Sequence, residues 1–149
     1  KRYVIGLGNW TMGDDSIGLR IVEEIVHRKL DKGFESVALP DSGLNLIDYF
    51  GPDTEKILII DTVRAGKKPG EFFFFAPDHV STQKNLANIS THEGDVLKVI
   101  ELARQLGYPI PPIAIMGIEP GKLGPGELSK ALSDRIETYI QTAIVESKK

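Results

Sequence analysis

The chain has 149 residues, of which 41% are hydrophobic and 26% charged, with a formal net charge of −3 and no cysteine. This composition fits one soluble domain over residues 1–149, excludes disulfides and thiolate ligands, and argues against nucleic acid as a partner. No apolar run approaches the roughly 20 residues that cross a bilayer. The N-terminus also lacks a signal-peptide pattern, so we expect a cytoplasmic protein with no membrane contact.

Short apolar runs alternate with amphipathic helical patterns along the chain. In chain order, the sequence predicts a strand at 3–7, a helix at 17–30, a strand at 36–39, a short helix at 44–50, strands at 56–61 and 71–76, a helix from about 90 to 106, a strand at 113–118 and a helix from about 127 onward. This order predicts an α/β fold with three layers, α/β/α, around a mostly parallel sheet of about five strands. The fourth strand follows the third after a short turn, which favours an antiparallel position at the edge.

Polar residues follow several of the predicted strands. Asp14 and Asp15 come after the first strand, Asp61 ends the third, and His92 opens the helix that precedes the last. Ligands of open α/β sheets bind beyond the carboxyl ends of the strands, so these residues are expected to lie near one another. Two carboxylates and an imidazole suit nickel or zinc and leave coordination positions open for a substrate.

The same residues also fit purely structural roles. Asp14 or Asp15 would be a normal N-cap for the first helix, and Asp61 a normal turn residue. Ser90 and Glu93 have the spacing of a capping box, which would make the histidine between them incidental. Each position alone is therefore ambiguous, and only their combination indicates a metal site.

The first loop carries a recognisable motif, Gly6-Leu7-Gly8-Asn9-x-x-Met12-x-Asp14-Asp15-x-x-Gly18. It resembles the signature of the hydrogenase maturation proteases. Shorter motifs that resemble this family follow in the same order: Asp41-Ser42-Gly43, Ile59-Ile60-Asp61, Pro69-Gly70-Glu71, Ser90-Thr91-His92 and Gly117-Ile118-Glu119-Pro120. The resemblance extends over nearly the whole chain.

The resemblance implies an endopeptidase whose partner is the precursor of a [NiFe]-hydrogenase large subunit. Such a protein recognises the nickel-loaded precursor and removes its C-terminal extension. By position in the motifs, the metal ligands would be Asp15, Asp61 and His92. The precursor would supply the nickel through its own cysteines, and cadmium or zinc would be able to substitute. Ser16 and Ser42 stand where the family usually has glycine, so we expect shifted loop geometry at both positions.

The residues that break the peptide bond and hold the substrate are less clearly marked. The bound metal would polarise the scissile carbonyl or activate water, or it would serve recognition while a carboxylate acts as general base. Asp41 is the candidate base, although it also fits a turn after Pro40. Trp10 and Phe73 are candidate substrate contacts, because aromatic anchors often dominate interfaces. Burial of the phenylalanines at 72–75 under a helix is the simpler alternative.

Two other functions agree with part of the sequence. The opening Gly-Leu-Gly-Asn also resembles peptidyl-tRNA hydrolases, but Trp10 stands where that family has proline, and the negative charge argues against tRNA. The second alternative is a non-catalytic nickel-binding assembly module that has kept the fold and lost cleavage.

Overall fold

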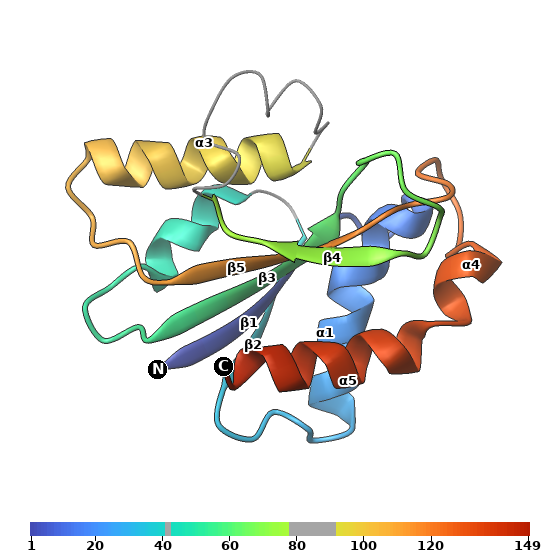
Figure 1. The fold of residues 1–149 in the computed structure, drawn as a ribbon, viewed down its shortest axis with the longest axis horizontal. Helices are drawn as coiled ribbons and strands as arrows, with labels where there is room; N and C mark the ends of the chain where they lie inside the picture. Colours follow the sequence, from blue (N-terminus) through green and yellow to red (C-terminus); the bar gives the residue numbers. More distant parts are fainter. Residues whose placement is uncertain (41–42, 78–91) are drawn as a thin grey trace.

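The computed structural model describes residues 1–40, 43–77 and 92–149. Its strands are β1 (Arg2–Leu7), β2 (Glu35–Leu39), β3 (Lys56–Thr62), β4 (Phe72–Phe75) and β5 (Ile113–Ile118). Its helices are the 3-10 helices η1 (Gly13–Ser16) and η2 (Gly43–Tyr49) and the α-helices α1 (Ile17–His27), α3 (His92–Gln105), α4 (Lys130–Ser133) and α5 (Ile136–Ser147). Figure 1 shows the sheet between α3 on one side and α1 with α5 on the other.

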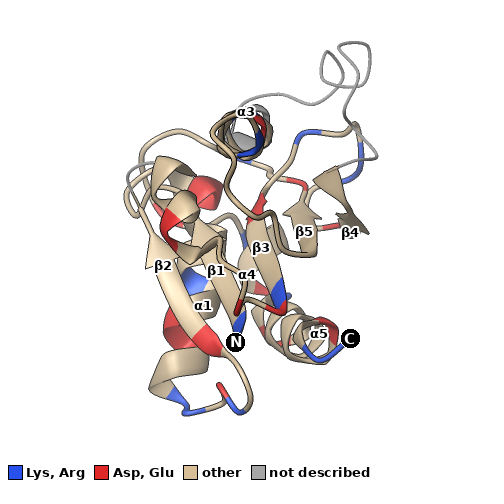
Figure 2. Cartoon of the chain, turned by 90° about the vertical axis from the view of Figure 1, so that its left-hand side faces the viewer, with Lys and Arg blue, Asp and Glu red and all other residues tan. Residues whose placement is uncertain are grey.

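The five strands form one sheet in the order β2-β1-β3-β5-β4. The first four pair in parallel, and β4 pairs antiparallel with β5 at the edge. Figure 2 views this sheet with β2 at one margin and β4 at the other. The three-layer fold, the parallel core and the antiparallel edge strand predicted from the sequence are all confirmed.

Each face of the sheet has its own hydrophobic core. Even-numbered residues of β3, among them Leu58 and Ile60, pack with α1 and α5. Odd-numbered residues of the same strand, among them Ile57 and Ile59, pack with η2 and α3. This alternation follows from the strand's two-residue period, and it decides which face each polar residue at the end of β3 joins.

Two glycines of the first motif allow α1 to lie almost against the sheet. A β-carbon at Gly18 would stand 2.4 Å from the backbone oxygen of Ile60, and one at Gly6 would stand 2.2 Å from the oxygen of Gly18. No larger residue fits either position without moving backbone. The motif therefore fixes how closely the start of α1, and the acidic residues just before it, approach the end of β3.

The helix boundaries differ from the sequence prediction at several places. The first helix ends at His27 instead of residue 30, and the segment 43–49 is a 3-10 helix rather than an α-helix. The last helical segment begins at Lys130 and is interrupted at 134–135. Val26 and Leu106 are 50% and 62% exposed. Both lie in or beyond the last turn of their helices, where the hydrophobic stripe has rotated away from the sheet.

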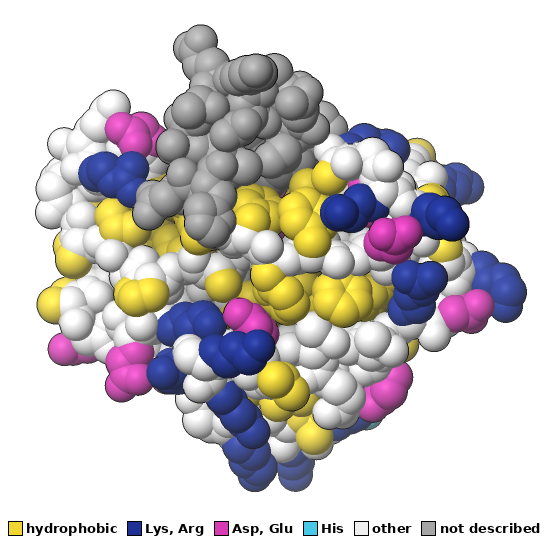
Figure 3. All heavy atoms as spheres, viewed as in Figure 1, with side chains coloured by type: hydrophobic (Ala, Val, Ile, Leu, Met, Phe, Trp, Pro, Cys, Tyr) yellow, Lys and Arg dark blue, Asp and Glu magenta, His cyan; other side chains and the backbone are white. Residues whose placement is uncertain are grey.

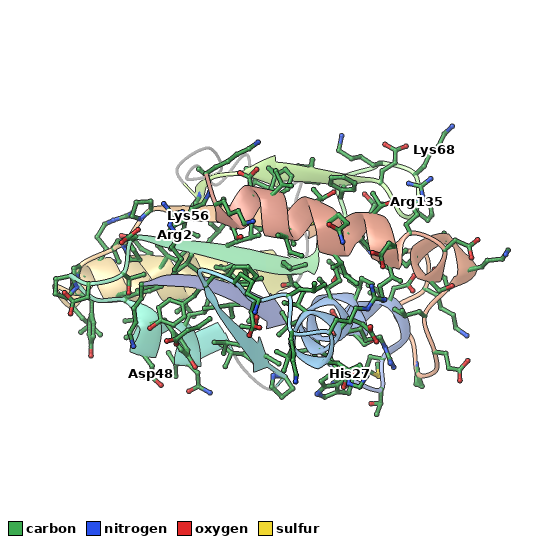
Figure 4. The ribbon with its side chains drawn as sticks, turned by 90° about the horizontal axis from the view of Figure 1, so that it is seen from below. Arg2, His27, Asp48, Lys56, Lys68 and Arg135 are labelled. Atoms are coloured by element: carbon green, nitrogen blue, oxygen red, sulfur yellow. The ribbon has the colours of Figure 1, made fainter. Side chains whose placement is uncertain are left out.

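The C-terminal end of α5 lies beside the N-terminus of the chain. Arg2 donates hydrogen bonds from Nη1 to the backbone oxygens of Ser147 and Lys149, both at 3.0 Å, and Lys56 Nζ donates to the oxygen of Glu146 at 3.0 Å. Figure 4 shows Arg2 and Lys56 together at this end of α5. Cations at a helix C-terminus satisfy its last carbonyls and its dipole, so these contacts fix α5 to the sheet. Among the described residues, no helix has the length and apolar character needed to cross a membrane.

Candidate metal and peptidase site

Asp61 lies at the carboxyl end of β3 and is fully buried. Its place in the strand's alternation puts its side chain on the face that α3 covers, with Ile57 and Ile59. The backbone N–H of Thr62 donates to Asp61 Oδ1 at 2.8 Å. A turn residue would be exposed, so the structural alternative weighed for Asp61 in the sequence is wrong.

Asp15 approaches the same strand end from η1. It is 5% exposed, and its Oδ1 accepts a hydrogen bond from the hydroxyl of Thr62 at 3.1 Å. Thr62 thus donates to both carboxylates, through its side chain to Asp15 and through its backbone to Asp61. The N-cap of α1 is Ser16 and makes no side-chain capping bond, so neither Asp14 nor Asp15 caps this helix.

Two of the predicted site residues lie at or beyond the limits of the described structure. The backbone of His92 opens α3, the helix on the face to which Asp61 belongs, but its side chain is outside the described part, as is the whole of Asp41. Within the described residues, no three acidic or histidine side chains gather into a metal cluster. The structure therefore links Asp15 and Asp61 through Thr62 and leaves the roles of His92 and Asp41 as predictions.

Asp14 has a role that the sequence did not reveal. Its carboxylate accepts hydrogen bonds from the backbone N–H groups of Gly121, Lys122 and Ser129 and from the Ser129 hydroxyl, at 2.7–2.8 Å. The side chain is fully buried. Asp14 therefore anchors the loop between β5 and α4, and the last helical segment starts directly after Ser129.

Glu119, the acidic residue of the Gly-Ile-Glu-Pro motif, anchors the loop between β3 and β4. Its Oε1 accepts from the backbone N–H groups of Ala65 at 2.8 Å and Lys67 at 3.0 Å. Its backbone oxygen accepts from the N–H of Gly70 at 2.8 Å. The carboxylate is 5% exposed. This residue keeps the loop that follows Asp61 in one conformation.

Ser16 replaces the usual glycine by joining a local hydrogen-bond network. Its buried hydroxyl donates to the oxygen of Gly13 at 2.7 Å and accepts from Arg20 Nε at 2.8 Å. The Arg20 guanidinium lies 5.9 Å from the centre of the Trp10 ring, over its face. This cation–π contact orients Trp10, the candidate substrate contact, beside the first loop.

Phe73, the other candidate contact, stands in the same cross-strand row as Asp61. Both residues pair with Gly117 of β5, Phe73 from the antiparallel side and Asp61 from the parallel side. They are therefore two strands apart, about 10 Å along the sheet. Phe73 is half-buried, stacks on Phe75 with ring centres 5.3 Å apart, and has Lys67 Nζ 5.1 Å from its ring centre.

The face that carries β4 is apolar in its middle and basic at its ends. Figure 3 shows hydrophobic side chains across this face, where Figure 1 places β4, with Lys and Arg side chains on either side. All four phenylalanines of β4 are half-buried. Phe72 and Phe74 pack against the core that α5 covers, so the alternative of burial under a helix holds in part for these two.

The chemistry of these residues is suited to binding a hard or borderline cation. Two carboxylates at one strand end supply oxygen ligands, and a histidine at the start of α3 would add nitrogen. The described residues thus fit a divalent ion, while sulfur ligands must come from another molecule.

Comparison with known proteins agrees with this description. The family model described as hydrogenase maturation protease, HycI, matches residues 19–146. The hydrogenase expression/formation proteins HupD of Bradyrhizobium diazoefficiens and Rhodobacter capsulatus are each 27% identical to the chain. The alignments cover 94% and 96% of this chain and 74% and 69% of those proteins.

Solved structures agree as well. The hydrogenase maturating endopeptidase HybD from E. coli superimposes with a TM-score of 0.80 at 20% identity, over 99% of this chain and 93% of that one. The [NiFe] hydrogenase maturation protease HycI from Thermococcus kodakarensis gives 0.69 at 26% identity, with the same coverage. The family model matches well over half of the chain, and the first motif, at residues 6–18, lies outside the matched range. That motif therefore supports the family assignment independently. The chain belongs to the hydrogenase maturation protease family and is an endopeptidase of that family.

Proposed function

We propose that this endopeptidase recognises a nickel-loaded [NiFe]-hydrogenase large-subunit precursor and removes its C-terminal extension, and that it works in the cytoplasm. In this proposal Asp15, Asp61 and His92 bind the nickel that the precursor carries. The observation that carries it is the meeting of two buried carboxylates at the end of β3, one from η1 and one from the strand. Thr62 hydrogen-bonds to both carboxylates, and carboxylate oxygens are ligands that divalent cations take in proteins.

The composition of the chain supports nickel as part of the substrate. The protein has no cysteine, so it offers only oxygen and nitrogen ligands. An ion that is already bound to thiolates of the precursor would gain oxygen and nitrogen ligands from this site. Recognition would then require both metal and peptide, which restricts cleavage to precursors that have already received nickel.

The peptide would contact Phe73 and Trp10. Phe73 belongs to the row of Asp61, and Trp10 follows β1 at the same edge of the sheet. Glu119 holds the loop after β3 in place, so the groups on this side of the site are preorganised. We assign the general base to Asp41, which would take a proton from the attacking water.

Calorimetric titration with NiCl2 tests the metal site. We expect about one equivalent to bind to the wild type, and the affinity to fall at least about 100-fold in Asp15→Asn, Asp61→Asn and His92→Ala, because each loses one ligand. His27→Ala, which removes a histidine at the end of α1, is the matched control and should bind as the wild type does. Binding that survives His92→Ala would show that the site has been misplaced.

A cleavage assay on nickel-loaded precursor tests the activity itself. We expect wild-type enzyme to release the C-terminal extension and Asp41→Asn to bind the precursor but cleave it far more slowly. Precursor loaded with cadmium or zinc separates the two roles of the ion. Cleavage at an unchanged rate would indicate recognition, whereas a rate that follows Lewis acidity would indicate catalysis. Nickel binding without cleavage would instead favour the non-catalytic assembly module.

A further inference from the structure

Thr62 is the last residue of β3, and it contacts both carboxylates of the site. It is 2% exposed, and its side chain belongs to the α1 face of the sheet while that of Asp61 belongs to the α3 face. Its hydroxyl donates to Asp15 Oδ1 at 3.1 Å and its amide to Asp61 Oδ1 at 2.8 Å. One residue therefore joins a carboxylate of η1 to a carboxylate of the strand.

The hydroxyl of Thr62 has a fixed orientation. A β-branched side chain has few allowed χ1 rotamers, and the backbone of Thr62 is paired with Ile118 of β5. The hydroxyl has one proton, which it gives to Asp15. Asp15 itself sits on a short 3-10 helix, whose backbone is less regular than that of the sheet. The more rigid residue thus orients the carboxylate on the less rigid one.

We propose that Thr62 is a positioning residue that sets the affinity of the site for a divalent cation by holding the carboxylate of Asp15 at the end of β3. This inference rests on the proposed function, because it takes Asp15 as a ligand. A carboxylate held by a hydrogen bond loses less rotational freedom when an ion binds. Outer hydrogen-bond partners of this kind typically change metal affinity by about 10–100-fold.

The test is calorimetric titration with NiCl2 alone, without precursor, on folded protein. Thr62→Val keeps the shape and loses the hydroxyl, and we expect its affinity for nickel to fall about 10–100-fold. Thr62→Ser keeps the hydroxyl and should stay within about threefold of the wild type. Thr54→Val is the matched control. It also removes a threonine hydroxyl bond, from Oγ1 to the oxygen of Tyr49 at 2.8 Å, but it precedes the opposite end of β3 from Thr62.

A second pair of variants separates positioning from packing. Thr62→Ala and Thr62→Ser both lose the γ-methyl group, and they differ only in the hydroxyl. If Thr62→Val does not fold, a lower nickel affinity of Thr62→Ala than of Thr62→Ser supports the proposal. Equal affinities overturn it, because the hydroxyl then contributes nothing to binding.

The outcomes also distinguish this inference from the proposed function. If the wild type binds nickel, His92→Ala does not, and Thr62→Val binds as the wild type does, the positioning role is wrong and the metal site stands. If the wild type binds no nickel in the absence of precursor, the chain has no cation affinity of its own for Thr62 to set. The positioning role is then overturned, while the cleavage assay on nickel-loaded precursor still decides the function.

Discussion

Asp14 and Asp15 are neighbours in one 3-10 helix, and both are buried, yet they serve different parts of the molecule. Asp14 receives four hydrogen bonds from the loop between β5 and α4, whereas Asp15 faces the end of β3 and receives the hydroxyl of Thr62. Successive residues of a 3-10 helix point about 120° apart, so adjacent carboxylates reach different surroundings. Of the two acidic residues in the motif, Asp14 is therefore structural and Asp15 is the candidate ligand.

Asp14→Asn should give the largest change in stability. Asparagine retains one acceptor oxygen and turns donors toward backbone N–H groups, so we expect the free energy of unfolding to fall by about 3 kcal/mol or more. Urea unfolding measures this loss. In protein that remains folded, nickel affinity should change by less than about threefold.

Asp15→Asn is the matched variant for this comparison, because it makes the same chemical change one residue away. It should leave the free energy of unfolding within about 1 kcal/mol of the wild type, since an amide oxygen can still accept the bond from the Thr62 hydroxyl. The assignment of Asp14 to stability and of Asp15 to metal binding is wrong if Asp14→Asn abolishes nickel binding while Asp15→Asn mainly destabilises the fold.

Glu119→Ala should have an intermediate effect on the free energy of unfolding. It removes the acceptor for the N–H groups of Ala65 and Lys67, and we expect a loss of about 2 kcal/mol. Hydrogen exchange at these two amides should accelerate. Glu119→Gln retains an acceptor oxygen and should lose less than half as much. Equal losses in the two variants would mean that charge, rather than the hydrogen bonds, holds the loop.

Tyr139→Phe should have the smallest effect on the free energy of unfolding at neutral pH. The buried hydroxyl of Tyr139 donates to the oxygen of Gly70 at 2.6 Å, in the turn that Glu119 also holds. Loss of one such bond costs about 1 kcal/mol. Urea unfolding at pH 7 measures it, and Tyr108→Phe, at an exposed position, is the control that should change nothing.

The same tyrosine makes stability depend on pH in the alkaline range. Burial raises the pKa of Tyr139 to about 12, whereas an unfolded tyrosine titrates near about 10. Below about pH 10 both states keep the proton. Between about pH 10 and 12 the unfolded state loses it first, so stability falls as pH rises. In Tyr139→Phe this part of the fall should be absent. If the difference in free energy of unfolding between the wild type and Tyr139→Phe stays constant up to pH 12, the pH dependence does not come from Tyr139.

Much of the fold could be predicted because its signals are local. The apolar run at 57–60 predicts a strand buried on both faces, and the short turn before Phe72 predicts an antiparallel edge strand. The errors occur where tertiary contacts override local patterns. The last helical segment begins only after Ser129, whose backbone N–H bonds Asp14, a residue 115 positions away that no local pattern reveals.

The sequence by itself determined the family, the sheet and the set of acidic residues near its carboxyl edge, because motifs and hydrophobic periods are properties of neighbouring residues. Only the tertiary structure decided which carboxylate does what. Asp14 and Asp15 are equivalent in a linear motif, and they differ only through the N–H groups of 121–129 and the hydroxyl of Thr62, which folding brings to them. Thr62 itself carries no sequence signal, because its partner Asp15 lies 47 residues away.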